Sequence, residues 1–196
     1  MEIELSEEPI SGLRQQADIS IAFEVDRLFD VEPRANAATG FRLAERSVAT
    51  PYTKDYDAID GEGPGRWAER FDVSKWGYIV ARLDGHRVGG AVIAFDTAGV
   101  EMLEGRRDLA VLWDVRVCPG LRGSGVGSAL FEAAETWAAA RGCRQIKVET
   151  QNINARACRF YAKHGCTLRR VERLAYAQFP DEVRLLFYKD ITAACS

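Results

Sequence analysis

The sequence predicts an α/β protein with a mixed sheet and helices on both faces of that sheet. The order of segments carries this prediction, because several strand-like runs are followed by an alternation of strand, loop, helix, strand, helix and strand. The composition, with 47% of the 196 residues apolar and 28% charged, is that of an ordinary globular protein. The chain shows no internal repeat or low-complexity tract. We therefore expect a single domain over residues 1–196.

The first part of the chain gives the weaker signals. Apolar residues alternate over 19–25, which predicts a strand. Residues 41–48 and 65–71 have helical patterns. Between them, "DYDAIDGEGPG" (residues 55–65) is acidic and rich in glycine, which predicts a loop.

A hairpin and a further strand follow. The β-rich runs at residues 78–83 and 88–95 flank an Asp-Gly turn, which is a hairpin signal. After a polar connection, "LAVLWDVRV" (residues 109–117) predicts another strand with a mostly apolar face.

The C-terminal part has the clearest periodicity. Apolar residues at helical spacing follow Gly125, and Gly142 is suited to cap the end of that helix. Residues 144–150 then predict a strand, residues 155–165 a second helix and residues 182–191 a last strand.

Charge and cysteine usage exclude several classes of protein. A net charge of −3 and a pI near 5.6 do not favour nucleic acid as a partner. The acidic N-terminus has no apolar core, and no run of residues is apolar enough to cross a membrane, so we expect a cytoplasmic protein without a membrane partner. Five cysteines without a CxxC pair, together with two histidines, indicate reduced thiols and no metal site.

The segment "CPGLRGSGVGS" (residues 118–128) joins a strand to a helix and is the main candidate site. Glycines before a helix allow a phosphate to approach the unpaired N–H groups of the first turn. No acidic residue occurs between Cys118 and Phe131. The backbone amides expected to face a diphosphate are those of Arg122, Gly123, Ser124, Gly125, Val126, Gly127 and Ser128.

Several kinds of ligand compete for this loop. A nucleoside triphosphate is disfavoured, because the loop has no lysine. A dinucleotide site would need GxGxxG directly after a strand, and here a "CPGLR" spacer intervenes and Ser128 takes the third glycine position. A turn without any ligand remains an alternative.

A second motif about 30 residues later distinguishes between them. The loop reads Arg-x-x-Gly-x-Gly from Arg122 to Gly127, and "NARACRFYAKHGC" follows from Asn154 to Cys166. Together these motifs resemble the GNAT acetyltransferases, which have Gln/Arg-x-x-Gly-x-Gly/Ala and then Asn-x-x-Ala-x-x-Phe-Tyr-x-x-x-Gly-Phe. Cys166 departs from the final phenylalanine, a difference expected to alter core packing. The resemblance covers residues 109–168 well.

This resemblance implies the GNAT fold, with a mostly antiparallel sheet and a central pair of splayed strands. It implies acetyl-CoA as co-substrate, with the diphosphate on the loop amides and the N–H groups of Val115 and Val117 beside the pantetheine arm. Asn154 matches the asparagine that contacts pantetheine in the family, and it also suits an N-cap. Residues 109–196 would be the acetyl-CoA-binding half, and residues 1–108 would carry the acceptor side.

The family reaction is direct attack of an amine on the thioester. Tyr161 matches the family's general acid, although a Phe-Tyr pair at this spacing also suits core packing alone. Asp114 and Glu149 stand where family members often carry a general base, and the sequence does not choose between them. Two alternatives to an acetyltransferase stay open, namely a NAD-binding oxidoreductase domain and a non-catalytic CoA-binding module.

The segment "VETQNINARACRFYAKHGC" is locally similar to the streptothricin acetyltransferases. We therefore expect a small-molecule amine as acceptor and, as is common in the family, a possible homodimer. In the family, acceptor sites use regions that correspond to residues 29–71 and 174–183, where Tyr176 and Phe179 would be walls. The acidic residues that would receive a polycation, or merely form a solvated surface, are Asp30, Glu32, Asp55, Asp57, Asp60 and Glu62.

Overall fold

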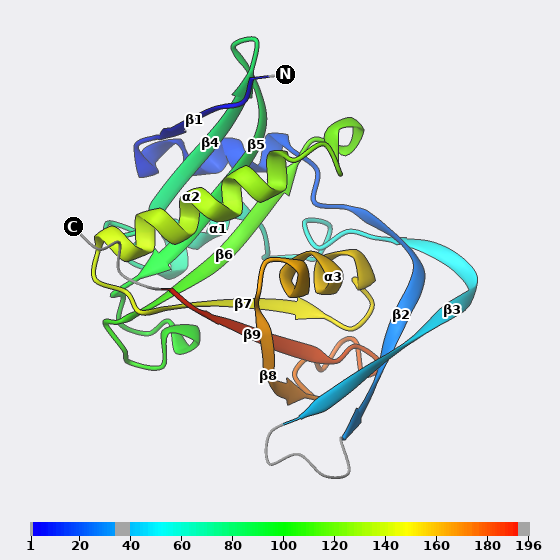
Figure 1. Ribbon diagram of the computed structural model, residues 1–196. Coiled ribbons are helices and arrows are strands. Elements are labelled where there is room, and N and C mark those ends of the chain that lie inside the picture. The colour runs from blue at the N-terminus through cyan, green and yellow to red at the C-terminus, as the bar shows by residue number, and fades with distance from the viewer. Residues whose placement is uncertain (1, 34–39, 192–196) are drawn as a thin grey trace. The chain divides into compact units, whose positions relative to one another are not determined.

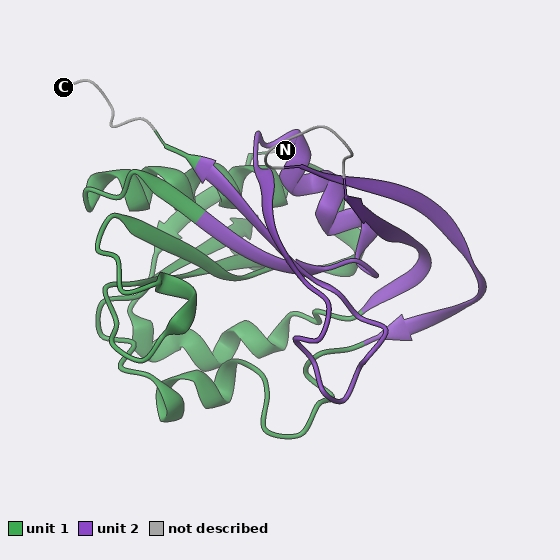
Figure 2. Cartoon of the chain, turned by 90° about the horizontal axis from the view of Figure 1, so that it is seen from below, with its two compact units in different colours: residues 1–22, 55–146, 190–196 green, residues 23–54, 147–189 purple. Residues whose placement is uncertain are grey.

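The computed structural model describes residues 2–33 and 40–191, and its elements are labelled in Figure 1. The chain forms two compact units that interleave in sequence, as Figure 2 shows. The first unit comprises residues 1–22, 55–146 and 190–196, and the second comprises residues 23–54 and 147–189. The boundaries of these units differ from the expected division at residue 108. The division into an acceptor half and an acetyl-CoA-binding half therefore remains a proposal about function.

The first unit is built on four antiparallel strands. In spatial order they are β1 (Glu4–Glu7), β4 (Gly77–Leu83), β5 (His86–Phe95) and β6 (Leu109–Val117). The predicted hairpin is β4 and β5, whose turn places Asp84 and Gly85 at positive φ. Its helices are η1 (Ile10–Asp18), α1 (Pro64–Arg70), η2 (Glu101–Leu103), η3 (Pro119–Leu121) and α2 (Val126–Ala140).

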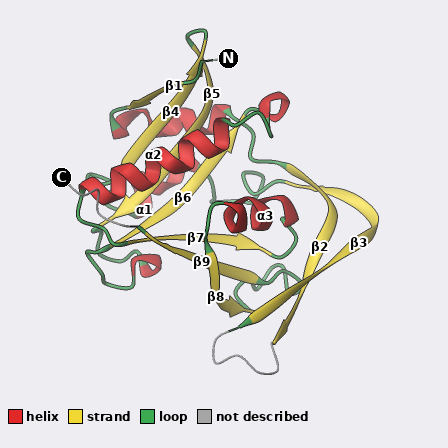
Figure 3. Cartoon of the chain, in the orientation of Figure 1, coloured by secondary structure: helices red, strands yellow, loops and turns green. Residues whose placement is uncertain are grey.

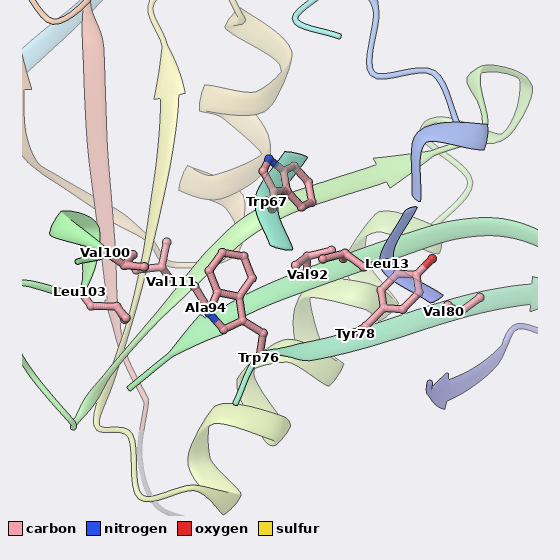
Figure 4. Packing of buried hydrophobic residues seen from close by; sticks show 10 residues of the cluster. All are labelled: Leu13, Trp67, Trp76, Tyr78, Val80, Val92, Ala94, Val100, Leu103 and Val111. Carbon is pink, nitrogen blue, oxygen red and sulfur yellow. The ribbon is translucent and has the colours of Figure 1, made fainter. Parts of the chain in front are cut away.

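Helices cover both faces of these strands, as the sequence predicts. On one face, η1, α1 and η2 contribute Leu13, Trp67 and Leu103 to a buried apolar cluster (Figure 4). The strands supply Tyr78 and four further residues, and Trp76 and Val100 come from segments next to β4 and η2. Helix α2 contacts β4, β5 and β6 and buries Leu130 and five further residues of its own. Burying two apolar faces in this way is what an α/β layer arrangement requires.

Two glycines show on which side α2 lies. A Cβ atom on Gly77 would come within 2.5 Å of the Trp137 ring, and one on Gly89 within 2.9 Å of a Leu130 methyl group. Tyr78 follows Gly77 directly and belongs to the cluster under η1 and α1. Since successive residues of a strand face opposite sides, α2 lies on the side away from that cluster.

The described residues of the second unit form strands of two sheets and helix α3 (Figure 3). Strands β7 (Gln145–Gln151), β9 (Arg184–Asp190) and β8 (Thr167–Glu172) are neighbours in that order, and β7 begins two residues before the unit does. Strands β2 (Phe23–Pro33) and β3 (Phe41–Lys54) form an antiparallel ribbon. Helix α3 (Ala155–Lys163) contacts β9 through the rings of Tyr161 and Phe187, whose centroids are 6.2 Å apart.

The structure corrects the prediction of a helix over residues 41–48, which lie in β3. Leucine, alanine, glutamate and arginine favour a helix locally, but the segment pairs with β2, where Val31 lies opposite Leu43 and Phe29 opposite Glu45. Pairing across a sheet regularly overrides such local preferences. The predicted strand at 19–25 begins at Phe23 and runs on to Pro33, and β1, β8 and η1 were not predicted.

No helix in residues 2–33 and 40–191 is long and apolar enough to span a membrane. Four cysteines, Cys118, Cys143, Cys158 and Cys166, are free thiols, whereas Cys195 lies outside the described residues.

Candidate active site

The glycine-rich loop leads from β6 through η3 to the first turn of α2. Gly123 and Gly125 have φ values of 86° and 100°, which L side chains rarely adopt, and Gly125 is the N-cap of α2. The Ala129 N–H donates to the Gly125 carbonyl at 3.0 Å, so the first intrahelical bond leaves the N–H groups of Val126, Gly127 and Ser128 without intrahelical acceptors. Apart from the adjoining residues, no heavy atom in the described part of the chain lies within 4 Å of a Cβ built on Gly123 or Gly125. The loop thus has open space and free amides where an anion would bind, and its residues fit a diphosphate.

Arg122 anchors this loop with its side chain. Its guanidinium donates to the carbonyls of Val117, Ser20 and Ala22 at 3.2, 2.8 and 2.7 Å. These bonds hold the segment that follows η1 against the end of β6. The backbone N–H of Arg122 also has an acceptor, because it donates to the Pro119 carbonyl at 3.3 Å. The Ser124 N–H likewise donates to the Leu121 carbonyl at 3.2 Å, so these two predicted phosphate contacts are already bonded within the loop.

The backbone of β6 presents two amides away from β5. The Cys118 N–H donates to the Val88 carbonyl of β5 at 2.8 Å. Because successive N–H groups of a strand point to opposite edges, those of Val117 and Val115 point away from β5. The register shifts at Trp113, which is an extra residue between the pairs Val92–Asp114 and Ile93–Leu112. Bulges of this kind often re-aim residues next to active sites.

Asp114 is buried in a polar network with Gln16 and Arg116. It accepts hydrogen bonds from Gln16 Nε2 at 2.7 Å and from Arg116 Nε at 3.0 Å. Burial raises the pKa of this carboxyl group, while Arg116 and Gln16 oppose the rise. Only 4% of the Asp114 side chain and 1% of the Arg116 side chain is exposed. In this setting Asp114 serves first to neutralise a buried guanidinium.

The network also fixes part of the acidic loop. Arg116 Nη2 donates to Asp57 Oδ1 at 2.9 Å, and its Nη1 donates to the Ile19 carbonyl at 3.1 Å. Asp55 Oδ1 accepts the Asp57 N–H at 3.0 Å. Asp57 is therefore an ion-pair partner within the first unit rather than a freely solvated charge.

The remaining acidic residues belong to different environments. Asp30 lies on β2 of the second unit and pairs with Arg46 at 2.9 Å, whereas Glu62 of the first unit lies 3.4 Å from Arg70. The six acidic residues of the prediction thus fall in both units, and whether those at 55–62 bind substrate stays a prediction.

Glu149, on β7 in the second unit, is the other candidate base. Its Oε1 accepts the Tyr176 hydroxyl at 2.7 Å, and its Oε2 lies 3.7 Å from Arg184 Nη1. Burial raises the pKa of the Glu149 carboxyl group, and the hydrogen bond from Tyr176 partly opposes this rise. The Glu149 side chain nevertheless keeps 28% of its surface exposed. The pKa is raised in both carboxyl groups, but only that of Glu149 is accessible from solvent, because Asp114 is almost fully buried.

The loop after β8 is attached to the second unit at several points. Lys54 and Glu182 form a buried ion pair, and Lys54 Nζ lies 3.2 Å from the centre of the Phe179 ring. Asn152 Oδ1 accepts the Val183 N–H at 2.8 Å. The two aromatic residues expected as walls therefore have specific partners, Tyr176 with Glu149 and Phe179 with Lys54.

Helix α3 carries the remaining candidates. Asn154 Oδ1 accepts the Ala157 N–H at 3.1 Å, which confirms the predicted N-cap. Tyr161 is buried, with its ring centroid 5.3 Å from that of Phe160 and 6.2 Å from that of Phe187. Its core-packing role is therefore present, and its role as an acid remains a proposal.

Sequence reasoning missed Gln16, Arg116 and the partnership of Tyr176 with Glu149. Arginine alternating with valine in "WDVRV" carried one signal, because a charge on a mostly apolar strand must find a partner if it is buried. The partners themselves are 59, 98 and 27 residues apart in the pairs Asp57–Arg116, Gln16–Asp114 and Glu149–Tyr176, so no local pattern connects them.

A strand with outward amides, followed by a helix whose first amides have no intrahelical acceptors, suits a protein that binds a phosphate-bearing co-substrate. Comparison with known proteins identifies the class of protein, because the model of the acetyltransferase (GNAT) family matches residues 45–166. A streptothricin acetyltransferase of Escherichia coli is 34% identical over 158 residues, covering 81% of this chain and 78% of the relative. The chain belongs to the GNAT acetyltransferase family.

Solved structures agree with the fold. A nourseothricin acetyltransferase has a TM-score of 0.74 at 23% identity, covering 98% of this chain and 100% of that one. A protein of Bacillus anthracis str. Ames in complex with acetyl coenzyme A has a TM-score of 0.76 at 22% identity, covering 96% and 99%. The fold is the mixed α/β GNAT fold, and the protein is an acetyl-CoA-dependent N-acetyltransferase of that type.

Proposed function

We propose that this enzyme transfers an acetyl group to a primary amine of a small polycationic molecule, of the streptothricin, aminoglycoside or polyamine kind. The observation that carries the donor side is the start of α2, where free amides and two glycines at positive φ follow strand β6. The similarity to a streptothricin acetyltransferase over 81% of the chain supports the acceptor class.

On the donor side, the amides of Gly123 and of residues 125–128 would hold the diphosphate, and the N–H groups of Val115 and Val117 would hold the pantetheine arm. Asn154 would contact the same arm with the part of its side chain that does not cap α3. Acetyl-CoA supplies an activated acetyl thioester. A backbone N–H aimed at the thioester oxygen would stabilise the charge that develops there by about 3 kcal/mol.

On the acceptor side, the neutral amine would attack the thioester directly. Its nitrogen bonds to the acetyl carbon as the carbon–sulfur bond breaks, and holding both reactants in place supplies much of the acceleration. Glu149 would take the amine proton, directly or through a water molecule, because its carboxyl group is accessible and its raised pKa makes it a stronger base. Tyr161 would give a proton to the leaving thiolate.

A panel of amines tests this function. Purified protein with acetyl-CoA is assayed for thiol release against streptothricins, aminoglycosides, polyamines and small monoamines, and each product is identified by mass spectrometry. We expect acetylation of at least one polycation and weak activity on monoamines. Activity on monoamines alone would contradict the polycationic acceptor, and silence across the panel would contradict all of the proposed kinds of acceptor.

Replacing Tyr161 by phenylalanine tests the acid. We expect kcat to fall about 100-fold, because proton transfer by a positioned side chain contributes about that much, while acetyl-CoA affinity changes little. Steady-state kinetics and calorimetry measure the two quantities. Tyr78→Phe, at a buried tyrosine of β4 whose hydroxyl accepts from Arg87 Nη1 at 2.9 Å, is the matched control and should keep full turnover. Equal turnover in the two variants would leave Tyr161 only its packing role.

Replacing each carboxylate by its amide separates the two candidate bases. We expect Glu149→Gln to lower kcat about 100-fold and to remove the acidic limb of the pH–rate profile, since the amide cannot accept a proton. Asp114→Asn should mainly lower the free energy of unfolding, because it removes one of the negative charges that neutralise the buried guanidinium of Arg116. An acidic limb that disappears in Asp114→Asn and persists in Glu149→Gln would reverse the assignment.

A further inference from the structure

The short hydrogen bond to Glu149 comes from Tyr176 rather than from the neighbouring arginine. Tyr176 donates to Oε1 at 2.7 Å, whereas Arg184 Nη1 stays 3.7 Å from Oε2. Arg184 is engaged with Glu172 of β8, to which its Nε donates at 2.6 Å and with which its Nη2 also pairs. Glu149 therefore keeps one oxygen fixed by a neutral donor and the other outside hydrogen-bond distance of the arginine.

The direction of the Tyr176 proton is fixed by Gln151. The Gln151 side-chain NH₂ donates to the Tyr176 hydroxyl oxygen at 2.8 Å. An amide NH₂ group can only donate, so the phenolic hydrogen is left to bond to the carboxylate. The three side chains form a chain of donors that ends at Glu149.

The backbone around Tyr176 is fixed as well. The Phe179 N–H donates to the Tyr176 carbonyl at 3.1 Å, and the Glu182 N–H donates to the Phe179 carbonyl at 3.0 Å. Farther along, the ion pair between Lys54 and Glu182 is buried, and Asn152 bonds the Val183 N–H. A phenol on a loop held at these points keeps one orientation, which a group that positions another side chain needs.

We propose that Tyr176 is a positioning residue for Glu149, holding Oε1 so that Oε2 receives the proton of the acceptor amine. This rests on the proposed function, in which Glu149 is the base. The other charged groups that act on Glu149 are Arg184 from β9, Glu172 from β8 and Lys147 from β7. Arg184 and Glu172 pair with each other and act in opposite directions on the pKa of Glu149, so their effects partly cancel. Tyr176 is therefore the partner whose removal should change this pKa most clearly.

Replacing Tyr176 by phenylalanine tests the proposal without requiring a known acceptor. The side-chain carboxyl carbon of Glu149 is followed by NMR in protein labelled with ¹³C-glutamate, and Glu149→Gln identifies its resonance. A hydrogen bond to the ionised carboxylate stabilises it, so losing that bond raises its pKa, by about one unit. The acidic limb of the pH–rate profile with the best amine of the panel should move to higher pH by the same amount. Gln151→Leu should give a smaller shift, and Tyr78→Phe, in the core of the first unit, should give none.

Each outcome has a distinct meaning. A purely structural role for Tyr176 would lower turnover equally at all pH values without moving the limb or the Glu149 titration. An unchanged Glu149 titration in Tyr176→Phe would overturn the positioning role while leaving Glu149 as the base. An acidic limb that survives in Glu149→Gln would overturn the assignment of Glu149, and the positioning role with it.

Discussion

Replacing Gly125 by aspartate is expected to weaken acetyl-CoA binding by about three orders of magnitude. Gly125 caps α2 with a φ of 100°, and the space around it is open. A carboxylate there would lie beside the amides proposed to hold the diphosphate. Two like charges about 4 Å apart repel by about 4 kcal/mol at the effective dielectric near a protein surface, and each 1.4 kcal/mol is tenfold in affinity. Calorimetric titration with acetyl-CoA measures the change.

The matched control is Gly125→Asn, which has nearly the same size and the same backbone strain but no charge. Asparagine tolerates the left-handed region better than most residues, so the fold should persist in both variants. The difference in affinity between the two then reports the repulsion alone. Equal acetyl-CoA affinities for the aspartate and asparagine variants would show that no phosphate approaches this position.

Replacing Arg116 by methionine is expected to lower the free energy of unfolding by about 3–5 kcal/mol. The change leaves the buried Asp114 without its cationic partner and releases Asp57. Urea unfolding followed by the fluorescence of the four tryptophans measures the loss. Without Arg116 the folded-state pKa of Asp114 rises further above its value in the unfolded chain. The folded protein then binds the extra proton more tightly, so the loss should shrink as the pH falls from 7 towards 5.

Arg46→Met is the control for this variant. Arg46 pairs with Asp30 at 2.9 Å, but 55% and 52% of the two side chains are exposed. An exposed pair of this kind contributes up to about 1 kcal/mol, because water screens both charges. If both arginine variants lost equally little stability, the network around Arg116 would not contribute as a buried ion pair does.

The sequence predicted well where one element specifies its own structure. Helix α2 and the hairpin of β4 and β5 arise from local patterns, namely apolar spacing after Gly125 and an Asp-Gly turn between two β-rich runs. The N-cap role of Asn154 was equally local, because the capped N–H lies three residues away. The wrong helix over residues 41–48 marks the limit of this reasoning, since pairing with β2 determined that segment.

By itself, the sequence determined the family and the location of the glycine loop at the start of α2, where we propose that the diphosphate binds. Two motifs in order suffice for that, because a glycine loop and a helix start are defined by neighbours in the chain. Only the tertiary structure decided how the two carboxylates differ. Asp114 is enclosed with Arg116 and Gln16, whereas Glu149 keeps an exposed face and a phenol partner 27 residues away. Burial and partners of this kind depend on distant segments folding together, and they set the charge behaviour of a side chain.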